Sequence, residues 1–180
     1  NEEQLRDLLR QVLEALSACH ARGVVHCDLK PGNLLVTAEG KVLLADFGIS
    51  RAFQADNDDF QGSLSASRAL WGTPQYWPPE AWEGEKPTPA WDLYALGVVA
   101  FEAATGTLPF AATTLASLMR EKLDPESISV HDVAPDLAPG LARIIDWLSE
   151  SDPAMRPASA ADALAQLNEA SAQVRTVYGA

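Results

Sequence analysis

Cysteine, positive charge and long apolar runs are all scarce in this sequence. Cys19 and Cys27 are the only cysteines among 180 residues. Because neither has the spacing of a metal ligand, we expect two free thiols in a reducing cytoplasm. The 25 acidic residues outnumber 13 lysines and arginines, which gives a formal net charge of -12. Phosphate groups would be repelled, so this charge argues against a nucleic-acid or anionic-membrane partner.

No stretch is long and apolar enough to predict a membrane span. The most apolar segment, 98–104, is interrupted by Glu102 and is too short to cross a bilayer. The acidic amino terminus also lacks the apolar run of a signal peptide, so we expect a cytoplasmic protein. With 47% hydrophobic residues the chain can fill the core of one domain, residues 1–180. Because it opens on a helix at Asn1 and not on methionine, we expect it to belong to a longer protein.

The most informative segment is a polar loop, 25–35, between an amphipathic helix and an apolar strand. Asp28, Lys30 and Asn33 place a carboxylate, an ammonium and an amide close together, and the Pro-Gly pair between Lys30 and Asn33 favours a tight turn that lets them converge. These groups can orient a hydroxyl, neutralise a transferring phosphoryl group and hold a metal ion. The alternative is a helix-to-strand turn whose polar residues only cap backbone groups.

Hydrophobic periodicity predicts a mainly helical chain. Apolar residues at i, i+3, i+4 and i+7 indicate an amphipathic helix over about 2–22, capped by Asn1 and ended by Gly23. Residues 91–105 are apolar almost all round, which is typical of a helix buried in the middle of a domain. Further helices are predicted at about 113–122, 138–150 and 158–172, with fraying from about residue 175.

A short β-hairpin is predicted after the polar loop, with strands at 34–36 and 41–45. It leads into Asp46-Phe47-Gly48. A carboxylate at a strand end followed by glycine can approach a phosphate-bound cation closely, which indicates a metal ligand.

The segment 49–70 is polar and without a clear period, so a long mobile loop is predicted there. Three of its serines could be phosphorylated or could simply be exposed to solvent, namely Ser63, Ser65 and Ser67. The segment is followed by the compact run 71–80, which is rich in proline and aromatic residues.

Together these motifs resemble the eukaryotic-like serine/threonine protein kinases, in the style of their bacterial branch. The resemblance covers essentially the whole chain. It implies the large, carboxy-terminal lobe of the kinase fold, mainly α with one or two short β-hairpins at the catalytic face. The residues that carry it are, in chain order, His26 to Asn33, Asp46-Phe47-Gly48, Gly72-Thr73-Pro74, Pro78-Pro79-Glu80, Asp92 and Arg156.

The resemblance implies transfer of the γ-phosphoryl group of ATP to a serine or threonine hydroxyl of a protein substrate. Asp28 matches the catalytic base that accepts the hydroxyl proton, and Lys30 matches the residue that neutralises the γ-phosphate. Thr73 matches the residue that bonds this aspartate and lysine and shapes the floor under the hydroxyl.

ATP and Mg2+ are the implied cofactors. Asn33 and Asp46 match the magnesium ligands, and Leu35 lies where the nucleotide would cover the lobe.

Five residues have implied structural roles. Glu80 and Arg156 match a buried ion pair that ties the activation segment to the last helices. Asp92 matches the anchor of the backbone at the catalytic turn, while His26 and Phe47 match members of an internal apolar spine.

The sequence departs from the family pattern in two places and in its extent. Cys27 stands where most members have an arginine that pairs with a phosphorylated loop, which weakens the expectation of control by phosphorylation. Pro78 replaces the usual alanine, a mild change. The glycine-rich loop, strand lysine and helix glutamate of the smaller lobe have no counterpart in the residues before His26.

We therefore expect negligible activity from this chain alone, and a need for the small lobe in cis or in trans. The apolar surface that the small lobe would cover, around Leu35, Leu44 and Phe47, is expected to favour self-association. Two other hypotheses stay open. The chain could be a non-catalytic scaffold or binding module, or one half of a split kinase completed by a partner.

Overall fold

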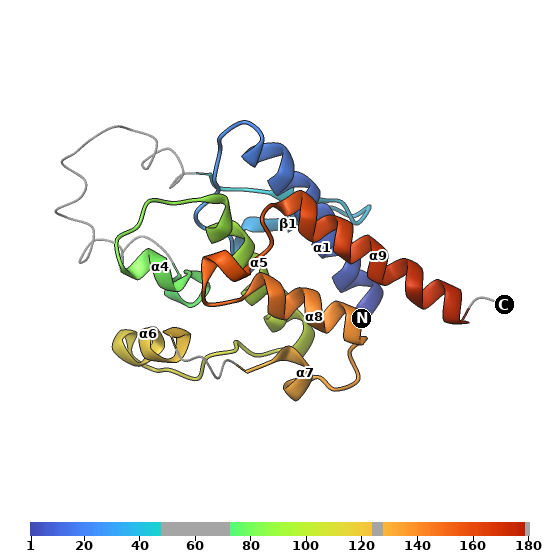
Figure 1. The fold of residues 1–180 in the computed structure, drawn as a ribbon. Helices are drawn as coiled ribbons and strands as arrows, with labels where there is room; N and C mark the ends of the chain where they lie inside the picture. Colours follow the sequence, from blue (N-terminus) through green and yellow to red (C-terminus); the bar gives the residue numbers. More distant parts are fainter. Residues whose placement is uncertain (48–72, 124–127, 179–180) are drawn as a thin grey trace.

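The computed structural model describes residues 1–47, 73–123 and 128–178. Helices dominate this part of the chain, with one two-stranded sheet beside them, so the predicted mainly α fold is confirmed (Figure 1). The elements are, in order, α1 (Glu2–His20), η1 (Pro31–Asn33), β1 (Leu34–Val36), β2 (Val42–Leu44), η4 (Pro74–Tyr76), α4 (Pro79–Trp82), α5 (Pro89–Thr105), α6 (Leu115–Leu123), α7 (Val130–Val133), α8 (Pro139–Leu148), η5 (Pro153–Met155) and α9 (Ala160–Tyr178).

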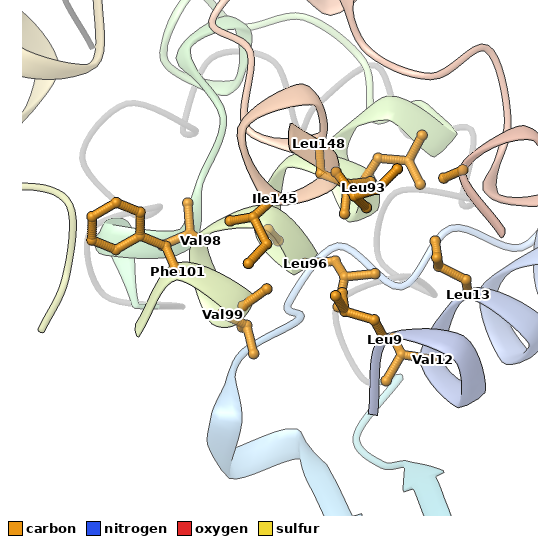
Figure 2. Packing of buried hydrophobic residues seen from close by; sticks show 14 of the residues in the cluster. Leu9, Val12, Leu13, Leu93, Leu96, Val98, Val99, Phe101, Ile145 and Leu148 are labelled. Atoms are coloured by element: carbon orange, nitrogen blue, oxygen red, sulfur yellow. The ribbon is translucent and has the colours of Figure 1, made fainter. Parts of the chain in front are cut away.

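Helix α5 forms the centre of the core. Every residue from Trp91 to Phe101 is buried, as its nearly uniform apolar sequence predicts. Helices α1 and α8 pack against α5, and α9 packs against both α1 and α8. Figure 2 shows apolar side chains of these elements meeting in one cluster. Gly97 allows α5 to lie close against the end of α8, because a Cβ on this residue would be only 2.7 Å from the backbone nitrogen of Ser149.

Helix α1 follows the predicted amphipathic pattern. Asn1 caps it, with its side chain accepting from the Gln4 N–H at 2.9 Å and Gln4 completing a capping box. The helix ends at His20, and Gly23 takes a positive φ of 71° in the turn that follows. Its buried face consists of Leu5, Leu9, Val12, Leu13 and Leu16.

The hairpin is antiparallel and is fastened to α1. Gln11 of α1 accepts from the Val42 N–H at 2.9 Å and donates to the Gly40 carbonyl at 3.0 Å. Leu35 pairs with Leu43, and both face outward, 52% and 43% exposed. The predicted apolar surface is corrected in one respect: Leu44 packs against the core, because side chains alternate between the two faces of a strand.

Several element boundaries differ from the predictions. Helix α9 continues to Tyr178, where fraying was predicted, and α8 ends at Leu148, two residues early. Helices α4 and α7 were not predicted, because each has only 4 residues and hydrophobic periodicity needs a longer window. In the described ranges, no helix combines the length and apolar character that a membrane crossing requires.

Candidate active site

The polar loop that follows α1 is held by a carboxylate of α5. Asp92 accepts from the backbone N–H groups of His26, at 2.8 Å, and Cys27, at 2.9 Å. The His20 ring Nε2 lies 2.8 Å from the same carboxylate. Cys27 has a φ of 68°, a conformation that costs a non-glycine residue free energy. The buried carboxylate of Asp92 therefore stabilises a strained turn just before Asp28.

Asp28, Lys30 and Asn33 converge as the sequence indicates. One carboxylate oxygen of Asp28, Oδ2, accepts from Lys30 Nζ at 2.7 Å and from Asn33 Nδ2 at 3.1 Å. Asn33 Nδ2 also donates to the Asp28 carbonyl at 2.8 Å, which closes the loop on itself. Asp28 is only 7% exposed. Among the described residues both side-chain bonds go to Oδ2, so Oδ1 is left to accept a proton.

His26 joins this loop to the end of the hairpin. Its Nδ1 accepts from the Asp28 N–H at 3.3 Å, and its Nε2 lies 2.9 Å from the Ala45 carbonyl. These contacts fit the tautomer that carries its proton on Nε2. The ring centroid lies 4.5 Å from that of Phe47, and the Ala45 N–H donates to the Asn33 carbonyl at 2.9 Å. Ala45, the residue before Asp46, is thereby tied to the polar loop.

The oxygens near this junction suit a magnesium ion. Asp46 is exposed and has a φ of 62°, and both hydrogen bonds of the Asn33 side chain use its nitrogen, which leaves the amide oxygen for a cation. Within the described ranges no group of three or more His, Cys, Asp and Glu side chains could hold a metal. Magnesium bound beside a nucleotide needs only one or two such ligands, because phosphates supply the others.

Thr73 does not make the bonds expected of it. Within the described part of the chain, no hydrogen bond joins its side chain to Asp28 or Lys30, which pair with each other. The Thr73 carbonyl instead accepts from the Tyr76 N–H at 3.1 Å, at the start of η4. Leu35 lies on the exposed face of the hairpin. The serines for which phosphorylation or mere solvation was left open, Ser63, Ser65 and Ser67, fall outside the described residues.

Glu80 and Arg156 are brought together from 76 positions apart. Arg156 Nη1 and Nη2 donate to the two carboxylate oxygens of Glu80 at 2.6 and 2.9 Å. The arginine also donates to the carbonyls of Glu150, Ala90 and Ser151. Both charged groups are buried, and every bond of the arginine is directed at an acceptor, so the desolvated charges are compensated.

Two polar residues with partners on other elements, the partly buried His20 and the buried Lys122, were missed by the sequence analysis. His20 contacts Asp92, as described, and Lys122 of α6 is buried beneath the segment 75–77. A basic residue in the last turn of a helix is ordinarily attributed to the helix dipole, so neither residue gave a distinctive signal. Cys27 is half-buried, and this burial raises the pKa of its thiol above the usual range, which makes it unreactive.

Comparison with known proteins decides the family. A family model described as "Protein kinase domain" matches residues 1–167. This chain belongs to the protein kinase family. It is 39% identical over 151 residues to "Serine/threonine-protein kinase PknA" of Mycobacterium tuberculosis, an alignment that covers 83% of this chain and 33% of that protein. It is 33% identical over 173 residues to "Probable serine/threonine-protein kinase pknA2" of Bifidobacterium longum, covering 94% of this chain and 22% of the relative.

A solved structure shares the fold. "Crystal structure of Rad53 1-466 in complex with AMP-PNP" superposes with a TM-score of 0.71 at 27% identity, covering 91% of this chain and 39% of that chain. These findings confirm the predicted membership among the eukaryotic-like serine/threonine kinases of bacterial type. The kinase chain spans about a third or less of the length of the curated relatives described above.

Proposed function

We propose that this chain is the large lobe of a serine/threonine protein kinase that transfers the γ-phosphoryl group of ATP to a protein hydroxyl. The observation that supports it best is the convergence of Lys30 Nζ and Asn33 Nδ2 on a single oxygen of Asp28. The loop holds this nearly buried carboxylate in place, and its second oxygen, Oδ1, remains able to take up a proton.

In the proposed reaction Asp28 acts as the base. Its Oδ1 accepts the proton of the acceptor hydroxyl as the hydroxyl oxygen bonds to the γ-phosphorus. The bond from that phosphorus to the β,γ-bridging oxygen breaks, and ADP leaves with the electron pair. Lys30 is close enough to Asp28 to stabilise the negative charge of the transferred group. The strained turn held by Asp92 keeps this geometry fixed before the substrate arrives.

Asn33 and Asp46 are the residues that would hold Mg2+ beside the nucleotide. The ion, when bound, would neutralise phosphate charge and orient the leaving group. His26 and Phe47 would act as positioning residues, because their ring contact and the contact of His26 with the Ala45 carbonyl tie the polar loop to the residues on either side of Asp46. The proposed role of Leu35 is apolar contact with the nucleotide base, for which its outward-facing position on β1 is suitable.

The test compares Asp28→Asn with wild type in the native protein that contains this chain. With Mg-ATP and a serine-containing acceptor, kcat is expected to fall about 100- to 10,000-fold, the usual contribution of a general base. Asp132→Asn, an exposed carboxylate on α7, is the matched control and should keep the wild-type rate. Phosphoryl transfer at an unchanged rate by the Asp28 variant would refute the proposal.

The same proposal includes a second lobe, in cis or in trans, that supplies the remaining nucleotide contacts. The support is the exposed pair Leu35 and Leu43, an apolar surface at the edge where the nucleotide would lie. This chain alone, mixed with Mg-ATP and a basic acceptor protein, should therefore turn over at no more than a trace rate. A scaffold without catalysis would instead show no transfer in the native protein either.

A further inference from the structure

Lys122 is the least expected buried group in the molecule. It is 1% exposed, and its ammonium donates to the carbonyls of Gln75 and Trp77, both at 2.8 Å, and to the Tyr94 hydroxyl at 3.3 Å. An ammonium has three N–H donors, so each is used. The nitrogen also lies 4.2 Å from the centroid of the Phe110 ring. These uncharged partners together hold the buried ammonium of Lys122 in one position.

The two carbonyls belong to the segment that follows Thr73. In η4 the Tyr76 N–H bonds to the Thr73 carbonyl at 3.1 Å and the Trp77 N–H bonds to the Pro74 carbonyl at 3.2 Å. The carbonyls of Gln75 and Trp77 take no part in these two bonds and face Lys122 of α6. Lys122 satisfies both at once, so the path of the backbone beyond Thr73 depends on a side chain that comes from a different helix.

Helix α6 contributes little else to the core. Leu118 and Lys122 are its only buried residues, and the helix is in contact with α4, which directly follows the segment. The bonds of Lys122 are therefore a principal link between α6 and the chain around 75–77. Leu118 and the Ser151 hydroxyl, which donates to the Lys122 carbonyl at 2.8 Å, also attach α6, but among the described residues it is the Lys122 side chain that bonds α6 to this segment.

The surrounding charges do not neutralise Lys122. Glu80 of α4 and Arg156, which follows η5, pair with each other nearby, and Tyr94 of α5 presents a hydroxyl. Burial, together with the Arg156 charge, lowers the pKa of Lys122 well below the usual range. Burial also raises the pKa of Tyr94, which keeps that hydroxyl protonated. An uncharged amine would keep both carbonyl bonds and could accept from Tyr94, so the link survives either protonation state.

We propose that Lys122 is a positioning residue for the protein substrate: from α6 it fixes the backbone of residues 75–77, which continues from Thr73, the residue that the family resemblance assigns to the floor under the acceptor hydroxyl. This inference rests on the proposed function. Its consequence is that removing the donors should weaken binding of the acceptor protein while leaving ATP binding and the Asp28 carboxylate unaffected.

The experiment compares Lys122→Gln with Arg120→Gln in the native protein that contains this chain. Arg120 is an exposed cation on the same helix, so the control makes the same replacement without touching the segment. For Lys122→Gln, the KM of an acceptor peptide should rise about tenfold or more, whereas the KM of ATP should stay within about twofold of wild type. Equal rises in both constants, or an unchanged acceptor KM in a folded variant, would overturn the proposal.

A second measurement does not need activity. Hydrogen exchange of the Tyr76 and Trp77 amides should be faster by about tenfold in Lys122→Gln and unchanged in Arg120→Gln, because the helical turn η4 loses its support. Unchanged exchange would refute the positioning role. If wild type transfers no phosphate but the exchange difference is found, the proposed function fails while the link between α6 and η4 stands. Should Lys122→Gln not fold, Lys122→Met, which keeps nearly the length of the side chain but removes its donors, must raise exchange at these amides, or the inference fails.

Discussion

At the scale of single residues, the site depends on buried polar groups whose partners lie far away in the chain. Asp92 holds the backbone before Asp28, and Glu80 holds Arg156. A buried charge that loses its partner retains its desolvation cost, so such residues are expected to be far more sensitive than surface ions. The difference can be tested within this molecule, because α1 carries exposed ion pairs.

Replacing Glu80 by Gln should lower the free energy of unfolding by roughly 3 to 5 kcal/mol, because Arg156 would be left buried without a counter-charge. The control is Asp7→Asn, which breaks an exposed pair with Arg10 at 2.6 Å and should cost less than about 1 kcal/mol. Urea denaturation of both variants measures the difference. Equal losses would show that the buried pair contributes no more than a surface pair.

At the scale of elements, the long helices were predictable and the short ones were not. Helix α1 has a clear 3.6-residue period and a capping residue, and α5 has an apolar sequence too long for a strand. The convergence of Asp28, Lys30 and Asn33 was predictable because the three residues are local in the sequence. The partners of Lys122 and His20 lie on other elements, and burial of one lysine among exposed ones depends on tertiary packing that periodicity does not record.

The contact between α5 and α8 gives a prediction at this scale. Gly97→Ala should destabilise the fold by about 1 to 3 kcal/mol, because the new Cβ would lie 2.7 Å from backbone that cannot move independently. Gly32→Ala is the matched control, since no atom lies within 4 Å of a Cβ built there. Thermal unfolding followed by circular dichroism should show a lower midpoint for Gly97→Ala alone. An unchanged midpoint would mean that α8 shifts to accommodate the methyl group.

At the scale of the whole molecule, the exposed apolar side chains of the hairpin lead to a prediction about association in solution. We expect this chain, purified alone, to self-associate through Leu35 and Leu43, which are 52% and 43% exposed on one face of the sheet. The double variant Leu35→Thr, Leu43→Thr should restore a monomer, because threonine keeps the strand conformation and adds a hydroxyl.

Light scattering at rising concentration measures this association. Val133→Thr is the control, since Val133 is 47% exposed on α7 and belongs to a different surface. A wild-type chain that stays monomeric at high concentration would contradict the prediction, as would association that the double variant does not reduce.

The burial of α5 on all sides also bears on how the sequence can change over time. A helix with one exposed face accepts substitutions at regular intervals, and α1, with its polar stripe, has that freedom. From Trp91 to Phe101 no such interval exists, because each position meets another element. Sequence drift in this molecule should therefore be periodic along α1 and nearly absent along the central turns of α5, and any change accepted there requires a compensating change in a neighbouring helix.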